Sequence, residues 1–188
     1  MFQVSCVLVS AIVMTLFVGY LSSRQDKFGK IVIWLLFLMY CIGYLQVTIL
    51  SREPGTGVTV SLIPFKTYSC LFEVQVASTT EVSGVAAAFL RGILPITGLI
   101  LNVLLFYPLG YLLTVLFPTM KPWYVVLIGV SVSIVTEGVQ YLFEMGWCET
   151  DDVIHNTLGT AVGTITRGIQ VYGIGYMSKG VCYEREES

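Results

Sequence analysis

The stretch SIVTEGVQYLFEMGWCETDDVIHNTLGTAVG, from Ser133 to Gly163, decides how this chain folds. It is as apolar as membrane-spanning helices are, yet it contains the single histidine of the sequence and a concentration of acids and amides. These polar residues are Glu137, Gln140, Glu144, Glu149, Asp151, Asp152, His155 and Asn156. Two apolar helices joined by a short polar turn fit this pattern. The stretch therefore predicts a pair of helices whose polar side chains gather near their connection.

The composition of the whole chain indicates an integral membrane protein. Of its 188 residues, 55% are hydrophobic and 12% are charged, whereas an ordinary soluble domain has roughly 25% charged residues. The mean hydropathy is +0.81. The net charge is -2 and the Lys and Arg residues are dispersed, which argues against a nucleic-acid partner. We expect one integral membrane domain over residues 1–188.

Five apolar segments predict an all-α, polytopic membrane helix bundle with about five transmembrane helices. A bilayer requires about 20 apolar residues per helix. The predicted spans are residues 2–21, 31–50, 93–117, 123–143 and 152–177. The first is interpreted as a span and not as a signal peptide, because it has no basic n-region. Pro95 and the Pro108-Leu109-Gly110 step predict interruptions of the third span.

Positive charges in the short loops predict the orientation. Arg24, Lys27 and Lys30 lie between the first two spans, and Lys121 lies between the third and the fourth. The loop 144–151 has no positive charge. Because cytoplasmic loops are enriched in Lys and Arg, we expect the N terminus outside and the C terminus in the cytoplasm of a bacterial cell membrane.

The long segment between the second and third spans, residues 51–92, is predicted to lie on the membrane surface. Residues 53–57 have a turn composition, and residues 82–91 fit a short interfacial helix. We interpret the segment as a surface hairpin.

Cysteine and histidine spacing gives no metal-binding pattern, and we expect neither a metal nor a cofactor. In the predicted topology, Cys70 and Cys148 are the pair that shares the outer compartment. A disulfide between them and the packing of free thiols are alternatives. Glu149, Asp151 and Asp152 also allow two interpretations: they bind a divalent cation in the outer loop, or they form a solvated acidic turn.

Helical spacing aligns polar residues on facing helices. Ser133, Glu137, Gln140 and Glu144 follow one another at intervals of four, three and four residues, which place them on one face of a helix. Asp152 and Asn156 form a second stripe at the start of the next helix. Counted along each helix, these residues and Asn102 on the third span lie at a similar depth in the outer half of the membrane. We therefore predict one outer-leaflet pocket, formed by Asn102, Ser133, Glu137, Gln140, Asp152 and Asn156.

Glu137 is the member of this set for which a functional role is favoured. An acid within a span costs roughly 2.5–3.5 kcal/mol on insertion scales, and such residues commonly mark functional sites. Amides such as Asn102 and Asn156 often only join helices, at about 0.6 kcal/mol each. Gly159 and Gly163 have the spacing of a small-residue packing interface.

Three ordered motifs resemble the VanZ-like family of bacterial membrane proteins. They are residues 102–110 (NVLLFYPLG), 133–140 (SIVTEGVQ) and 152–159 (DVIHNTLG), with residues 62–65 (LIPF) upstream. The resemblance covers about residues 62–163. The matching positions are Pro64, Phe65, Asn102, Pro108, Gly110, Ser133, Glu137, Gln140, Asp152, Asn156, Gly159 and Gly163. Many members have an Arg before the last motif, near the position where this chain has Trp147.

The resemblance implies a cell-envelope protein whose namesake is associated with teicoplanin resistance, without implying a known reaction. The favoured hypothesis is a binding protein, with membrane lipids as partners and a lipid head group, a cell-wall precursor or a glycopeptide as ligand. One alternative is a membrane-embedded enzyme with Glu137 as general base and Asp152 as a second carboxylate. The other is a small transporter in which Glu137 carries a proton. The oligomeric state is left open.

Overall fold

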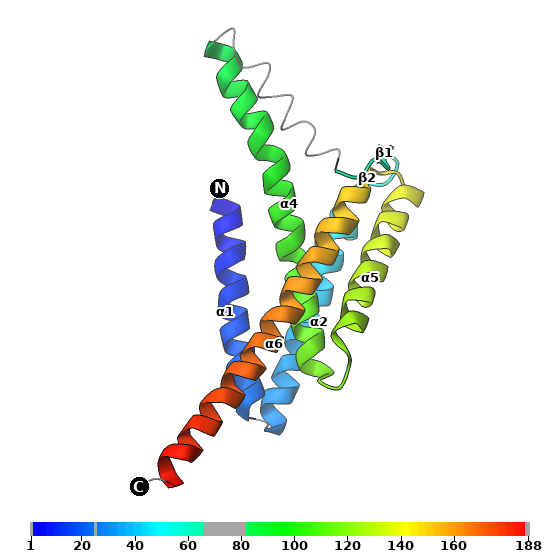
Figure 1. The fold of residues 1–188 in the computed structure, drawn as a ribbon. Helices are drawn as coiled ribbons and strands as arrows, with labels where there is room; N and C mark the ends of the chain where they lie inside the picture. The colour runs from blue at the N-terminus through cyan, green and yellow to red at the C-terminus, as the bar shows by residue number, and fades with distance from the viewer. Residues whose placement is uncertain (1, 25, 66–81, 187–188) are drawn as a thin grey trace.

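Long helices dominate the fold, as a computed structural model shows (Figure 1). The structure describes the backbone of residues 2–24, 26–65 and 82–186, and the side chains of residues 8–24, 26–65 and 96–173. The elements are α1 (Phe2–Arg24), α2 (Lys27–Leu45), the π-helical turn η1 (Gln46–Leu50), β1 (Gly57–Ser61), α4 (Val82–Leu116), α5 (Pro122–Leu142), β2 (Met145–Glu149) and α6 (Thr150–Glu186). The predicted helical bundle is therefore correct in outline, and two short strands are added to it.

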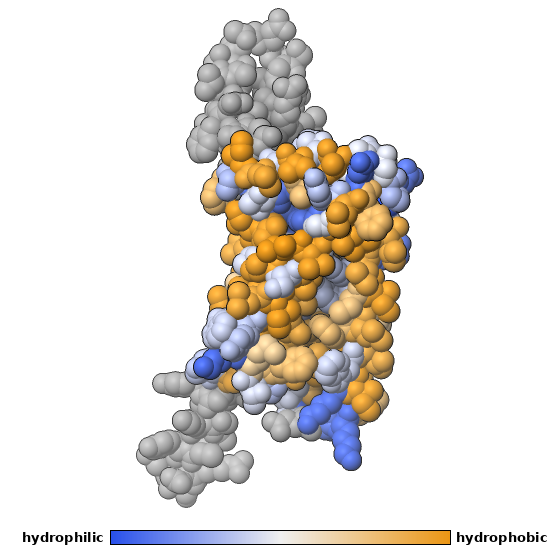
Figure 2. Space-filling view, turned by 90° about the vertical axis from the view of Figure 1, so that its right-hand side faces the viewer, coloured by the Kyte–Doolittle hydropathy of each residue, from blue (hydrophilic) through white to orange (hydrophobic). Residues whose placement is uncertain are grey.

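Within the part of the chain whose side chains are described, three helical segments are long and apolar enough to cross a membrane: Lys27–Leu50, Ile96–Leu116 and Pro122–Leu142. The described apolar part of α1, Leu8–Arg24, is shorter. Hydrophobic side chains cover the middle of the face in Figure 2, and hydrophilic ones gather toward its two ends. The chain is thus a helical membrane protein, and the fivefold crossing of the membrane stays a prediction.

The contact between α4 and α6 is the most extensive in the bundle. Glycines make it close: a Cβ added at Gly159 would collide with the Val103 carbonyl oxygen, and one at Gly163 would collide with the Tyr107 carbonyl oxygen. On the α4 side, Gly110 lies against the backbone of α6 in the same way. Small residues allow helix backbones to approach where apolar packing alone gives little association in lipid.

The helix α4 runs without interruption through both prolines, so the predicted breaks at Pro95 and Pro108 are wrong. The predicted interfacial helix 82–91 is part of the same helix. A proline removes one backbone hydrogen bond, but an apolar environment penalises every further unsatisfied group, so the helix continues. Gly110 in the same motif serves the contact with α6 and does not end the helix.

The predicted surface hairpin between the second and third spans is also wrong. Instead, β1 pairs in parallel with β2, so that Gly57 lies opposite Met145 and Ser61 opposite Glu149. The turn before β1 is fixed to the same distant segment, because the Gly55 amide donates to the Phe143 carbonyl oxygen at 3.0 Å. The segment after α2 is therefore attached to the α5–α6 connection.

The described residues do not test whether Cys70 pairs with Cys148. Cys70 lies outside the described residues, and Cys148 has a free thiol. The alternatives for this pair therefore stay predictions.

The strands and the ends of α5 and α6 form one end of the bundle, which we call the strand end (residues 51–65 and 143–152). The α1–α2 and α4–α5 connections, residues 24–27 and 117–121, form the opposite loop end (Figure 1). Lys and Arg side chains concentrate at the loop end, whereas acids concentrate at the strand end. The predicted orientation places the loop end in the cytoplasm.

The Gly163→Leu variant tests the contact between α4 and α6. Its side chain would meet the α4 backbone, so the free energy of unfolding should fall by at least about 1–3 kcal/mol, the usual cost of overpacking. The control is Gly168→Leu, since a Cβ at Gly168 meets nothing within 4 Å among the described residues. Thermal unfolding of both variants in the same detergent checks the prediction, and equal stability would place Gly163 against lipid.

Single cysteines at Glu53 and Thr119 of a cysteine-free chain test the orientation, because both positions are exposed and lie at opposite ends. In intact cells, a membrane-impermeant thiol reagent should label the Glu53→Cys chain and leave the Thr119→Cys chain unlabelled. Permeabilised cells, in which both should react, provide the control. Labelling at Thr119 alone would put the strand end in the cytoplasm.

Candidate functional site

A buried polar cluster lies where α4, α5 and α6 approach the strand end. It contains the six predicted pocket residues: Asn102 on α4, Ser133, Glu137 and Gln140 on α5, and Asp152 and Asn156 on α6. Four of them, Ser133, Glu137, Gln140 and Asn156, are buried. Direct side-chain contacts connect several of these residues across the helix interfaces.

One hydrogen bond joins α4 to the start of α6. The Asn102 Nδ2 donates to the Asp152 Oδ1 at 2.6 Å. Asp152 lies in the first turn of α6, where the helix dipole also favours a carboxylate. Asn102 lies inside the continuous α4, which Pro95 does not interrupt. The close crossing of α4 and α6 brings its amide to this carboxylate.

A second hydrogen bond joins α5 to α6. The Asn156 Nδ2 donates to the Ser133 Oγ at 2.9 Å. On the same side of α5, Gly129 lies against the Thr160 side chain and leaves no space for a Cβ. The amide at Asn156 thus serves to hold helices together, as well as being a candidate ligand contact.

Glu137 is 8% exposed and reaches the strand that follows its own helix. Its Oε2 accepts a hydrogen bond from the Glu149 backbone N–H at 3.1 Å. The carboxyl group also interacts electrostatically with Asp152 on α6 and with Arg52 before β1. The carboxyl groups of Glu137 and Asp152 thus lie near each other and largely away from solvent. Ionising both costs free energy unless a positive charge or a hydrogen-bond donor lies nearby.

Arg52 is the cation that sequence reasoning missed. Its charge acts on both Glu137 and Asp152, and its Nη1 donates to the Met145 carbonyl oxygen at 3.2 Å. The family resemblance implies an Arg near the position of Trp147, and in this chain Arg52 brings a guanidinium to the same β2 segment. Only the pairing of β1 with β2 places it there, and no local sequence signal indicates that pairing. The sequence offered Lys66 and Arg91 as substitutes for the Arg that the family resemblance implies; Lys66 lies outside the described residues, and the side chain of Arg91 is not described.

Gln140 connects α5 to the π-helical end of α2. Its Nε2 donates to the Thr48 carbonyl oxygen at 3.0 Å. Its Oε1 is buried and accepts no hydrogen bond from the residues that the structure describes. Since Thr48 offers a carbonyl oxygen there, the Gln140 amide nitrogen must face it. The free oxygen is therefore an available acceptor.

The Pro64-Phe65 motif is tied to the first turn of α6. The Phe65 backbone N–H donates to the Asp151 Oδ1 at 2.5 Å, and Phe65 has a φ of 64°. A left-handed conformation is uncommon for a residue other than glycine. For Asp151, which is buried, the sequence left a cation site and a solvated acidic turn as alternatives. The structure gives it a role in fixing the motif to the site.

The remaining polar groups near the site are Cys148 and His155. The Cys148 thiol lies beside the Glu137 carboxyl group, and burial, followed by the charge of Glu137, raises the pKa of this thiol. His155 is buried and interacts with Asp151 and Glu149. Within the described residues, no group of three or more His, Cys, Asp or Glu side chains is arranged to hold a metal ion.

The geometry agrees with the order of the motifs along the chain. The Pro-Phe segment, the α4 asparagine, the α5 acid and the α6 Asp and Asn meet at one end of the bundle. No curated protein and no solved structure matches the chain. The sequence profile described as VanZ/LLP1 matches residues 30–169, which include α4, α5 and the site. The chain belongs to the VanZ/LLP1 family.

Proposed function

We propose that the polar cluster at the strand end is a binding site in the outer leaflet of a bacterial membrane. Its ligand is a cell-envelope group rich in hydrogen-bond donors, such as the sugar and peptide parts of a cell-wall precursor or a glycopeptide. The observation that carries the proposal is the excess of buried acceptors over donors. The acceptors are the buried Glu137 carboxyl group and Gln140 Oε1, together with the half-buried Asp152 carboxyl group.

An acceptor-rich site selects its ligand by charge and by hydrogen bonding. A buried acceptor without a donor costs about 1–3 kcal/mol, and a ligand donor recovers that cost. Hydroxyl, amide and ammonium groups supply such donors. The phosphate of a lipid head group would instead meet two carboxylates with one guanidinium, that of Arg52, nearby. Among the three expected ligands, the electrostatics favour the glycan or peptide part over a phosphate.

The family membership supports a connection to glycopeptides. The namesake of the family is associated with teicoplanin resistance, and a site that faces the outside would meet both the drug and the wall precursor. We therefore propose that the protein reduces teicoplanin susceptibility by binding one of these molecules.

Catalysis is the second candidate, because Cys148 lies beside the Glu137 carboxyl group. A nucleophilic cysteine needs a lowered pKa, which a nearby cation or a helix N-terminus commonly provides. Here burial raises the pKa of the thiol first, and the neighbouring Glu137 raises it further. These surroundings favour the neutral thiol and support binding over acyl transfer.

The Glu137→Gln variant tests the proposed site. The glutamine retains an oxygen that can accept from the Glu149 N–H, so the chain should fold with unchanged or higher stability once the buried charge is removed. Loss of a charge-assisted hydrogen bond should weaken labelled-glycopeptide or wall-precursor binding by about tenfold or more. Teicoplanin susceptibility of cells that express equal amounts of each form is the second measurement.

The matched control is Glu144→Gln, an exposed acid at the same end of the bundle. It makes the same change of charge without touching the cluster, so binding and susceptibility should stay at the wild-type level. Full activity of the Glu137→Gln chain would reduce Glu137 to a structural tie of β2. A parallel loss in both variants would indicate a general effect of surface charge.

A further inference from the structure

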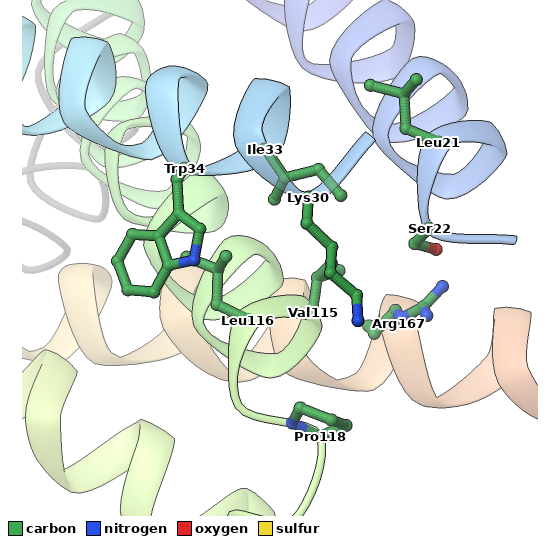
Figure 3. Close-up of a pocket in the computed structure, with 9 residues that line it drawn as sticks. All are labelled: Leu21, Ser22, Lys30, Ile33, Trp34, Val115, Leu116, Pro118 and Arg167. Atoms are coloured by element: carbon green, nitrogen blue, oxygen red, sulfur yellow. The ribbon is translucent and has the colours of Figure 1, made fainter. Parts of the chain in front are cut away.

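A cavity of about 420 Å³ opens at the loop end, away from the polar cluster (Figure 3). It lies between the end of α1, the start of α2, the end of α4 and the middle of α6. Its walls are formed by Leu21, Ser22, Lys30, Ile33, Trp34, Val115, Leu116, Pro118 and Arg167. Its volume is within the range of about 300–1,000 Å³ that is typical of small-molecule sites.

Two cations from different helices line this cavity, and none of the acidic side chains that the structure describes does. Figure 3 shows the Lys30 side chain of α2 extending toward Arg167 on α6. Arg167 lies beside the Tyr111 hydroxyl, but its Nη1 is buried and donates to no acceptor among the described residues. The nearest acid of the α1–α2 connection, Asp26, pairs with Arg24 at 3.5 Å.

This arrangement is incomplete without an anion. Two like charges that share a cavity repel each other, and a buried donor without an acceptor adds a further cost. An oxyanion between them would accept hydrogen bonds from both and would offset the repulsion. A guanidinium and an ammonium are the side-chain groups that most commonly bind phosphate.

The apolar walls of the cavity indicate that the anion belongs to an amphipathic molecule. Trp34 lines the cavity and also lines a second hollow, of about 440 Å³, along α2. The other residues of this hollow are Ile31, Leu35, Phe37, Leu38 and Cys41. A charged pocket that adjoins an apolar groove on a membrane-facing helix matches a lipid head group with its acyl chain.

We propose that the loop-end cavity binds the phosphate of an anionic phospholipid, with an acyl chain along α2. Lys30 and Arg167 hold the phosphate, and Trp34 lies between the head group and the chain. This site is independent of the one proposed at the strand end. Its ligand is an anion, whereas the strand-end site favours a ligand rich in hydrogen-bond donors.

Native mass spectrometry of the full chain, purified in detergent, tests the proposal with phosphatidylglycerol as the probe. The Lys30→Gln chain should bind this lipid about tenfold more weakly, since a charged hydrogen bond contributes roughly 1.5–3 kcal/mol. Arg167→Lys retains the positive charge and should keep most of the binding. Lys27→Gln is the matched control, because it removes the same charge from the same end without lining the cavity.

Phosphatidylcholine and inorganic phosphate distinguish the sources of the anion. Phosphatidylglycerol should bind more tightly than phosphatidylcholine, and millimolar inorganic phosphate should not displace it. Equal losses in the Lys30→Gln and Lys27→Gln chains, equal binding of both lipids, or full displacement by inorganic phosphate would each overturn the proposal. The strand-end proposal would stand after any of these results, since Glu137 is not involved.

Discussion

The close crossing of α4 and α6 is the constraint on which the rest of the structure depends. Without a hydrophobic force between helices in lipid, backbones must approach closely to hold each other. Gly110, Gly159 and Gly163 allow this approach, and it places Asn102 at hydrogen-bonding distance from Asp152. Polar groups at this depth need partners in the protein or in a ligand, because lipid offers none. The polar cluster therefore depends on the close helix crossing that the glycines permit.

The two ends of the bundle carry different polar groups, and for this reason we propose a different ligand for each end. The strand end presents acids and a free amide oxygen, which favour a ligand with many donors. The loop end presents Lys30 and Arg167 in a partly apolar cavity, which favours an anionic lipid. An anionic lipid at one end would fix the depth and tilt of the helices, and the other end could then face the envelope ligand at a constant level.

The sequence predicted the helices and the alignment of the polar residues on them because both depend on local patterns, whereas the binding pocket itself stays a prediction. Apolar length gives the spans, and helical spacing aligns Ser133, Glu137 and Gln140. The parallel pairing of β1 with β2 could not be predicted, since it joins segments far apart in the chain. The alternation in β1, GVTVS, does not identify its partner, and β2, MGWCE, does not alternate. For the same reason Arg52 was missed. The breaks expected at Pro95 and Pro108 failed because the apolar surroundings maintain the helix.

A double-mutant cycle on Asn102 and Asp152 tests most directly whether the crossing of α4 and α6 builds the site. The free energy of unfolding would be measured in one detergent for the wild type, Asn102→Ala, Asp152→Ala and the double variant. A direct hydrogen bond predicts a coupling energy of about 1 kcal/mol, within the range known for membrane helices. Strictly additive effects of the two substitutions would show that the residues do not meet and would contradict the assembly of the site by these helices.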